Sequence, residues 1–166
     1  MKIPTGNNKL YWNQMVELKV AVEYIRRYRD AMGFRVTCLG TLRAIASSGS
    51  IAAWVIWKEY AFVWAVIIAL SQLADALKDV FPFSKTHKAA SDHAGALASL
   101  FLDARMEWET ICTGRYTTEQ IQNRWQKLAK LHLEAERRAF PHGLATQEPL
   151  FAAAQRDAQD YFEKQR

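Results

Sequence analysis

The sequence predicts an all-α protein: a two-helix transmembrane hairpin that continues into a cytoplasmic antiparallel helical stalk, with two further C-terminal helices. Two observations lead to this prediction. Residues 36–57 and 60–77 are apolar segments separated by only two charged residues. The flanking segments repeat apolar residues in alternating steps of four and three, which is typical of helices that pack along a narrow seam.

Residues 1–35 predict a cytoplasmic N-terminal helix, because an apolar seam runs along them. Arg29 stands where the next apolar residue of this seam is due, and a buried arginine needs an anionic partner. The seam consists of Tyr11, Met15, Leu18, Val22, Ile25, Met32 and Val36.

Residues 36–81 predict the transmembrane hairpin, with its turn at Lys58 and Glu59. The first segment has 22 residues, and at about 1.5 Å per residue it is long enough for a ~30 Å hydrocarbon core. Its uninterrupted part, residues 44–57, has only 14 residues, which is the length of a buried helix in a soluble protein. Aromatic residues near the turn and small residues within the first segment favour the membrane. The alternative is an apolar hairpin buried in the core of an oligomeric scaffold.

Residues 82–166 predict a cytoplasmic helical region, and the three segments together form one domain. Pro82 ends the second apolar segment at or before Phe81. Thr117 and Gln120 form a capping-box pattern, and Thr146 can cap the last helix. A second seam consists of Ala90, Ala94, Leu97, Phe101, Ala104, Trp108 and Ile111.

The charge distribution predicts the orientation of the chain. The formal net charge is +5, and residues 1–35 hold seven basic residues against three acidic ones, a difference of +4. Such an excess before an apolar segment is typical of a cytoplasmic juxtamembrane region or of an anionic ligand site. The N-terminus has no apolar signal segment. We therefore expect both termini on the cytoplasmic side.

Polar residues inside the hairpin predict a pore. A turn at residues 58 and 59 places Arg43 and Asp75 at one depth, and ionisable residues in a span mark ion pathways. The alternative is a structural Arg43–Asp75 pair. Because one hairpin cannot enclose a water path, we expect a homo-oligomer, and a tetramer is a reasonable size. The predicted pore lining is Arg43, Ser47, Ser50, Ile51, Val55, Val63, Ile67, Ser71, Gln72 and Asp75.

A basic cluster in the N-terminal helix predicts a binding site for a nucleotide or a single-stranded oligonucleotide. Arginines with interleaved aromatic rings suit phosphates and stacked bases. Lipid headgroups, or carboxylates of the protein itself, are the alternative partners. The predicted site consists of Lys19, Tyr24, Arg26, Arg27, Tyr28, Arg29 and Arg35.

The sequence predicts no enzyme, no catalytic residue, no cofactor and no metal. It contains no GxSxG, P-loop, HExxH or glycine-rich dinucleotide turn. The two cysteines form no CxxC pattern, and the four histidines lack a metal-ligand spacing.

The plan of a helix, a two-segment hairpin and returning helices resembles the SLATT family of two-span membrane proteins. The resemblance covers about residues 9–112 and includes WNQMVELKVAVEYIRRYRD, IASSGSIAAWVIW and YAFVWAVIIALSQ. It implies a pore-forming effector of antiphage defence in the bacterial inner membrane, controlled by a partner nucleotidyltransferase. In one such system, Hailong, an oligodeoxynucleotide made by the partner keeps the effector silent. The C-terminal helical pair departs from a minimal SLATT unit.

Overall fold

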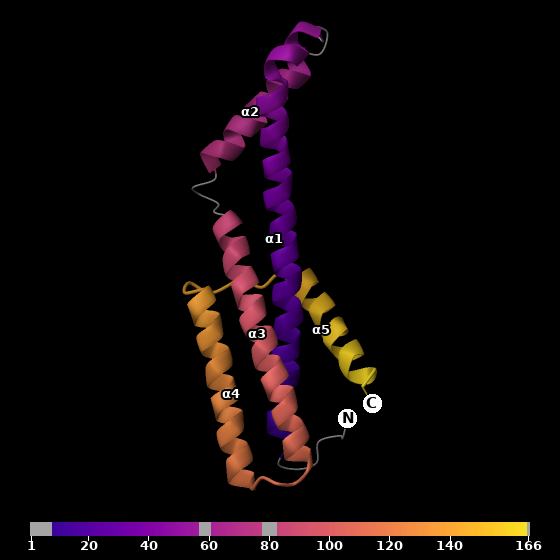
Figure 1. The fold of residues 1–166 in the computed structure, drawn as a ribbon, viewed down its shortest axis with the longest axis vertical. Coiled ribbons are helices and arrows are strands. Elements are labelled where there is room, and N and C mark those ends of the chain that lie inside the picture. The colour runs from indigo at the N-terminus through magenta and orange to yellow at the C-terminus, as the bar shows by residue number, and fades with distance from the viewer. Residues whose placement is uncertain (1–7, 57–60, 78–82, 166) are drawn as a thin grey trace. The chain divides into compact units, whose positions relative to one another are not determined.

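The computed structural model describes residues 8–56, 61–77 and 83–165, and within them the side chains of residues 45–56, 61, 64, 67, 74, 75 and 77 are outside the description. The described residues form five helices and no strand (Figure 1). The prediction of an all-α protein is therefore confirmed. The helices are α1 (Lys9–Ile56), α2 (Ala61–Leu77), α3 (Phe83–Cys112), α4 (Thr118–Ala139) and α5 (Glu148–Glu163).

The chain divides into two compact units. Unit 1 comprises residues 1–29 and 88–166, and unit 2 comprises residues 30–87. The long helix α1 and the helix α3 contribute residues to both units.

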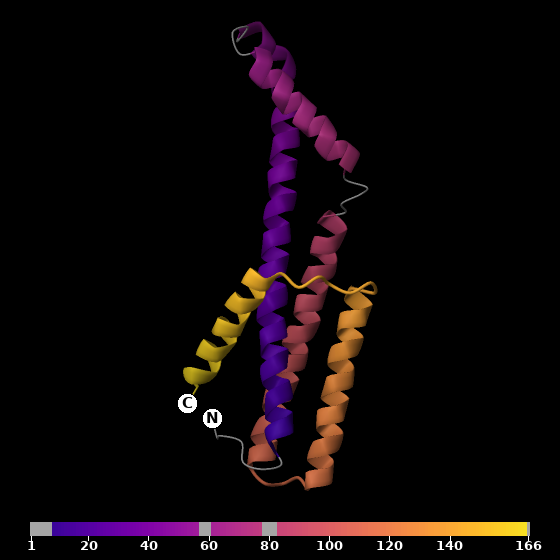
Figure 2. The same cartoon turned by 180° about the vertical axis from the view of Figure 1, so that it is seen from behind.

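Unit 1 is a bundle of α1, α3, α4 and α5. Within it α3 runs beside the first part of α1 in the opposite direction, with α4 beside α3 and α5 beside α1 (Figures 1 and 2). The second predicted seam is buried in unit 1 along its whole length, and the first is buried there from Tyr11 to Ile25, because each lines up apolar side chains on one face of its helix. Met32 and Val36 of the first seam belong to unit 2, where Met32 is buried and Val36 is half-buried. The buried residues include Tyr11, Met15, Leu18, Val22, Ile25, Ala90, Ala94, Leu97, Ala104, Trp108 and Ile111.

Aromatic rings fill the part of unit 1 where the start of α1 meets the ends of α3 and α5. The Trp12 ring centre lies 5.1 Å from that of Trp108 and 5.1 Å from that of Phe162. The Tyr11 ring stacks on Trp108, with 6.3 Å between the ring centres. Such rings contribute large apolar areas to a core, so this cluster joins three helices that are distant in the sequence.

The N-terminal end of α4 is formed as the sequence predicts. The Thr117 hydroxyl accepts a hydrogen bond from the Gln120 backbone N–H, and the Gln120 side chain accepts one from the Thr117 N–H, so the capping box is present. Gly114 and Gly143 flank the helix with φ of +74° and +77°. Residues with a Cβ rarely adopt this left-handed conformation, so glycine is required at both turns.

The cap predicted for the last helix is wrong. Helix α5 begins at Glu148, with Gln147 rather than Thr146 as its N-cap. The Gln147 backbone N–H donates to the Tyr24 hydroxyl at 3.1 Å, and Pro149 lies in the first turn. The N-cap residue of this helix therefore has a tertiary contact with α1, which local capping rules do not consider.

Unit 2 contains α2, whose described side chains are mostly exposed and apolar. They include Phe62, Val63, Val66, Ile68, Leu70 and Leu73. Among the described residues, no helix combines the length and the apolar character needed to cross a lipid bilayer. The predicted turn at Lys58 and Glu59 and the predicted helix end near Phe81 and Pro82 lie outside the described residues.

Candidate functional site

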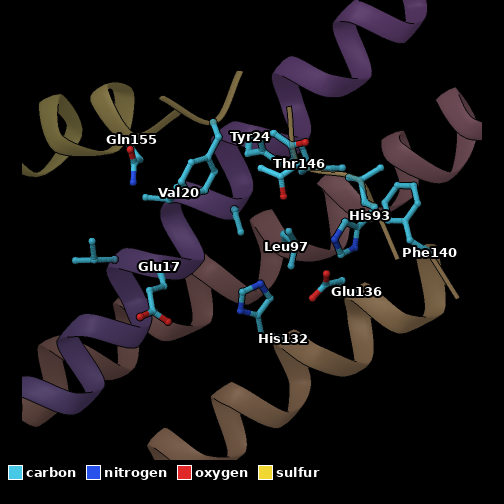
Figure 3. A pocket seen from close by; sticks show the side chains of 15 residues that line it. Glu17, Val20, Tyr24, His93, Leu97, His132, Glu136, Phe140, Thr146 and Gln155 are labelled. Atoms are coloured by element: carbon cyan, nitrogen blue, oxygen red, sulfur yellow. The ribbon is translucent and has the colours of Figure 1, made fainter. Parts of the chain in front are cut away.

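A cavity of about 480 Å³ lies in unit 1, among α1, α3, α4, α5 and the segment that leads to α5 (Figure 3). Cavities of about 300–1,000 Å³ are typical of small-molecule sites. Most of its wall is apolar, with Val20, Leu97, Phe140 and Phe151 among the lining residues. A few polar groups converge on this apolar space, as is common in binding pockets.

Helical periodicity brings the polar groups to the cavity. Glu17 and Tyr24 are two turns apart on α1, and His132 and Glu136 are one turn apart on α4. His93 comes from α3. Figure 3 shows the His132, His93 and Glu136 side chains around the same space, with Glu17 opposite on α1.

Tyr24 holds the segment between α4 and α5 at the edge of this cavity. Its hydroxyl donates to the Ala145 carbonyl oxygen at 3.4 Å and accepts from the Gln147 N–H at 3.1 Å. Its ring meets Phe151 edge-on, with 6.1 Å between the ring centres. Two hydrogen bonds and one ring contact from a single side chain thus fix the wall formed by this segment.

Both histidines of the cavity are neutral at pH 7. Burial lowers the pKa of His93, with Glu136 opposing the shift and His132 adding to it. Burial likewise lowers the pKa of His132, and the negative charges of Glu136 and Glu17 oppose this shift. A pKa below 6.5 leaves the imidazole mostly uncharged near neutrality. The two rings therefore offer hydrogen-bond acceptors, rather than positive charges, to the cavity.

His93 is the most enclosed polar residue of the cavity. His93 is 6% exposed, and its Nδ1 atom has no hydrogen-bond partner among the described residues. Its ring meets Phe140 edge-on, at 5.7 Å between centres. Among the described residues, no group of three or more His, Cys, Asp or Glu side chains could hold a metal ion.

Lys19 and Tyr28 of the predicted nucleotide site are buried. Lys19 is only 7% exposed, and its ammonium group lies 4.1 Å from the centre of the Tyr161 ring and 2.5 Å from Glu23 Oε1. The Tyr28 side chain is buried, with its ring edge-on to Phe140. These side chains therefore contact other residues of unit 1 rather than solvent.

The arginines of the predicted nucleotide site are more accessible. Arg26 pairs with Glu23 at 3.3 Å, and Arg27 pairs with Asp157 at 2.6 Å. Arg29 is half-buried, whereas the exposed Arg35 contacts Met32 in unit 2. The sequence left lipid headgroups and carboxylates of the protein itself as alternative partners of the arginines. Carboxylates of the protein pair with Arg26 and Arg27. Nucleotide binding by this cluster stays a prediction.

The predicted pore-lining residues belong to unit 2. Arg43 is half-buried, Ser71 is buried, and Val63 and Gln72 are exposed in the isolated chain. The side chains of Ser47, Ser50, Ile51, Val55, Ile67 and Asp75 lie outside the described residues, so the predicted Arg43–Asp75 layer does too.

Sequence reasoning did not single out the cavity. A spacing of four between His132 and Glu136 was the one local signal, since it places both side chains on one face of α4. The partners on α1 and α3 are about 40 to 120 residues away in the sequence, and no periodicity connects them.

Comparison of the chain with protein-family models, with curated proteins and with solved structures gives no match.

Proposed function

We propose that the chain is a membrane-inserted helical protein that assembles into a pore through unit 2. The observation that supports this proposal is the apolar surface of α2. Phe62 is 80% exposed and Leu73 is 54% exposed, and apolar side chains between them are exposed as well. A helix that is apolar on several faces belongs in a core, in an oligomer or in a membrane.

The energetic cost of leaving this surface in water is large. Fully burying one Val, Leu, Ile or Phe side chain contributes about 1.5–3 kcal/mol. Six such side chains of α2 are at least one-third exposed, so transferring them out of water would contribute roughly 5–10 kcal/mol. That amount is comparable with the whole stability of a small domain, and it favours a state in which α2 is covered.

Polar residues of unit 2 support a pore rather than an inert anchor. Gln72 is exposed beside the apolar residues of α2, Ser71 is buried, and Arg43 is half-buried on α1. In a membrane assembly such groups avoid lipid and face water or one another. Several copies of the chain would have to surround the water path, so the pore is a homo-oligomer.

Control by an anionic nucleotide, and a role in defence against phage, come from the resemblance to the SLATT family. On α1 the side chains of Arg26, Arg27 and Arg35 are exposed, so a phosphate group can reach them. We propose that a ligand made by a partner nucleotidyltransferase acts there and changes the state of the pore.

Cell fractionation tests membrane insertion. Wild-type protein should remain in the membrane pellet after a carbonate wash, because lipid covers α2. The double variant Val66→Asp/Leu70→Asp should move to the supernatant. Leu133→Asp is the matched control, because Leu133 is an exposed leucine on α4 of unit 1. Wild-type protein that is recovered as an oligomer in the supernatant would instead support the scaffold whose hairpin is buried in an oligomer core.

Dye release from liposomes tests the pore. Purified wild-type protein should release a trapped dye, and Val66→Asp/Leu70→Asp should release much less than Leu133→Asp does. In a planar bilayer, Arg43→Glu should change the conductance or the ion selectivity. An unchanged current would show that Arg43 does not line the pore.

Filter binding with short single-stranded DNA tests the ligand site. Affinity for an oligonucleotide held by arginines should fall as the salt concentration rises, because counterions are released on binding. The double variant Arg26→Ala/Arg35→Ala should weaken the binding of the oligonucleotide, while Arg156→Ala on α5 should leave it unchanged. Absent or salt-insensitive binding would contradict this part of the proposal without affecting membrane insertion.

A further inference from the structure

The cavity of unit 1 has an acidic wall, although the chain as a whole is basic. Glu17 and Glu136 line it, and no Lys or Arg is among its lining residues. Both carboxylates are exposed, and neither forms an ion pair among the described residues. With the two histidines neutral, the lining carries a formal charge of −2 at pH 7. An anionic nucleotide would therefore be repelled from this cavity.

The interior of the cavity combines aromatic surface with unused hydrogen-bonding capacity. Tyr24, Phe140 and Phe151 line it, and aromatic faces attract cations and pack against apolar groups. His93 is more than nine-tenths buried, its ring points into the space beside Phe140 and Glu136 (Figure 3), and its Nδ1 has no partner among the described residues. A buried polar atom without a partner is unfavourable unless a ligand or water satisfies it.

We propose that this cavity binds a small organic cation, with a primary ammonium group on an aromatic or aliphatic body. The ammonium group would lie between Glu17 and Glu136 and donate to the neutral imidazoles, while the body fills the apolar part beside Val20 and Leu97. All lining residues belong to unit 1, whereas the predicted pore-lining residues belong to unit 2. Tyr24 is the one residue of the predicted nucleotide site that lines this cavity, and none of the arginines of that site does.

Matched small molecules test the charge preference. Phenethylamine and 3-phenylpropionate share a phenyl ring on a short chain but carry opposite charges. Isothermal titration calorimetry with the full-length chain should show saturable binding of phenethylamine and much weaker binding of 3-phenylpropionate. Equal or tighter binding of the acid, or no saturable binding of the amine, would overturn the proposal.

Conservative variants test the position of the site. Glu17→Gln and Glu136→Gln remove a charge while keeping the shape, and each should weaken phenethylamine binding about threefold, with about tenfold for the pair. Glu134→Gln is the control. Glu134 is an exposed glutamate on α4, the helix of Glu136, and it does not line the cavity. An equal effect of all three single variants would place the amine elsewhere and overturn the assignment.

Discussion

The hydroxyl group of the fully buried Tyr11 donates a 2.8 Å hydrogen bond to Glu107 Oε2, between residues 96 positions apart in the sequence. The same hydroxyl lies 3.3 Å from the Ala104 carbonyl oxygen. Burial raises the pKa of Tyr11, so this hydroxyl stays protonated and remains a donor. Glu107 also pairs with Arg124 of α4. One phenol thus takes part in a polar contact that joins α1, α3 and α4.

Replacing this phenol tests the contact. Tyr11→Phe should lower the free energy of unfolding by about 1–2 kcal/mol, because a buried hydrogen bond to a charged acceptor is lost. Urea unfolding of the full-length chain, followed by circular dichroism, measures the change. Tyr116→Phe is the control, because the Tyr116 ring lies over Arg124 but its hydroxyl forms no hydrogen bond among the described residues. Equal losses in both variants would contradict a specific contribution of the hydrogen bond between Tyr11 and Glu107.

The buried ammonium group of Lys19 is also expected to stabilise unit 1. It lies 4.1 Å from the centre of the Tyr161 ring and 5.2 Å from that of Phe101, in addition to its pair with Glu23. Lys19→Met keeps the aliphatic stem but removes the charge, and should cost about 1–2 kcal/mol. Lys127→Met, at an exposed site on α4, should change the urea midpoint little. A midpoint that Lys19→Met leaves unchanged would contradict a stabilising role.

Acidification should destabilise unit 1. The pKa values of His93 and His132 are lowered below their ordinary value of 6.5 by burial. Below pH 6.5 the unfolded chain therefore binds more protons than the folded chain, and the free energy of unfolding falls as the pH falls. The melting temperature should be lower at mildly acidic pH than at pH 7.

Histidine variants identify the groups responsible for this pH dependence. His132→Gln should make the melting temperature less sensitive to pH between neutrality and mildly acidic conditions. His142→Gln, at an exposed site between α4 and α5, should leave the sensitivity as in the wild type. If His132→Gln retains the full dependence, His132 does not contribute to it.

Two glycines should respond in opposite directions to alanine. Gly143 has a φ of +77°, so Gly143→Ala should destabilise the protein by about 1–2 kcal/mol. Gly95 lies within α3, and a Cβ there would meet no atom within 4 Å. Gly95→Ala should therefore stabilise the helix by about 0.5–1 kcal/mol. Thermal melts of both variants measure the two signs, and destabilisation by Gly95→Ala would be inconsistent with an open helical site.

The all-α class and the buried faces of the unit 1 helices could be read from the sequence, because they depend on local rules. The repeat of four and three identified Leu18 and Leu97 as core residues, and the capping pattern identified Thr117 as the start of α4. Each of these features follows from residues that are at most a few turns apart. The capping rule misplaced the start of α5 at Thr146. The N-cap is Gln147, whose backbone N–H donates to the Tyr24 hydroxyl of α1.

The sequence by itself thus determined which segments are helices and which faces of α1 and α3 are apolar. The tertiary structure alone decided what the polar residues on those helices contact. Lys19 reads as one more cation of a basic cluster, yet the fold buries it against Tyr161. Glu17 and His93 carry no signal of their own, yet the bundle places both on one cavity with Glu136. Periodicity fixes the direction of a side chain relative to its own helix axis, whereas its partners depend on which helices adjoin, and long-range packing determines that arrangement.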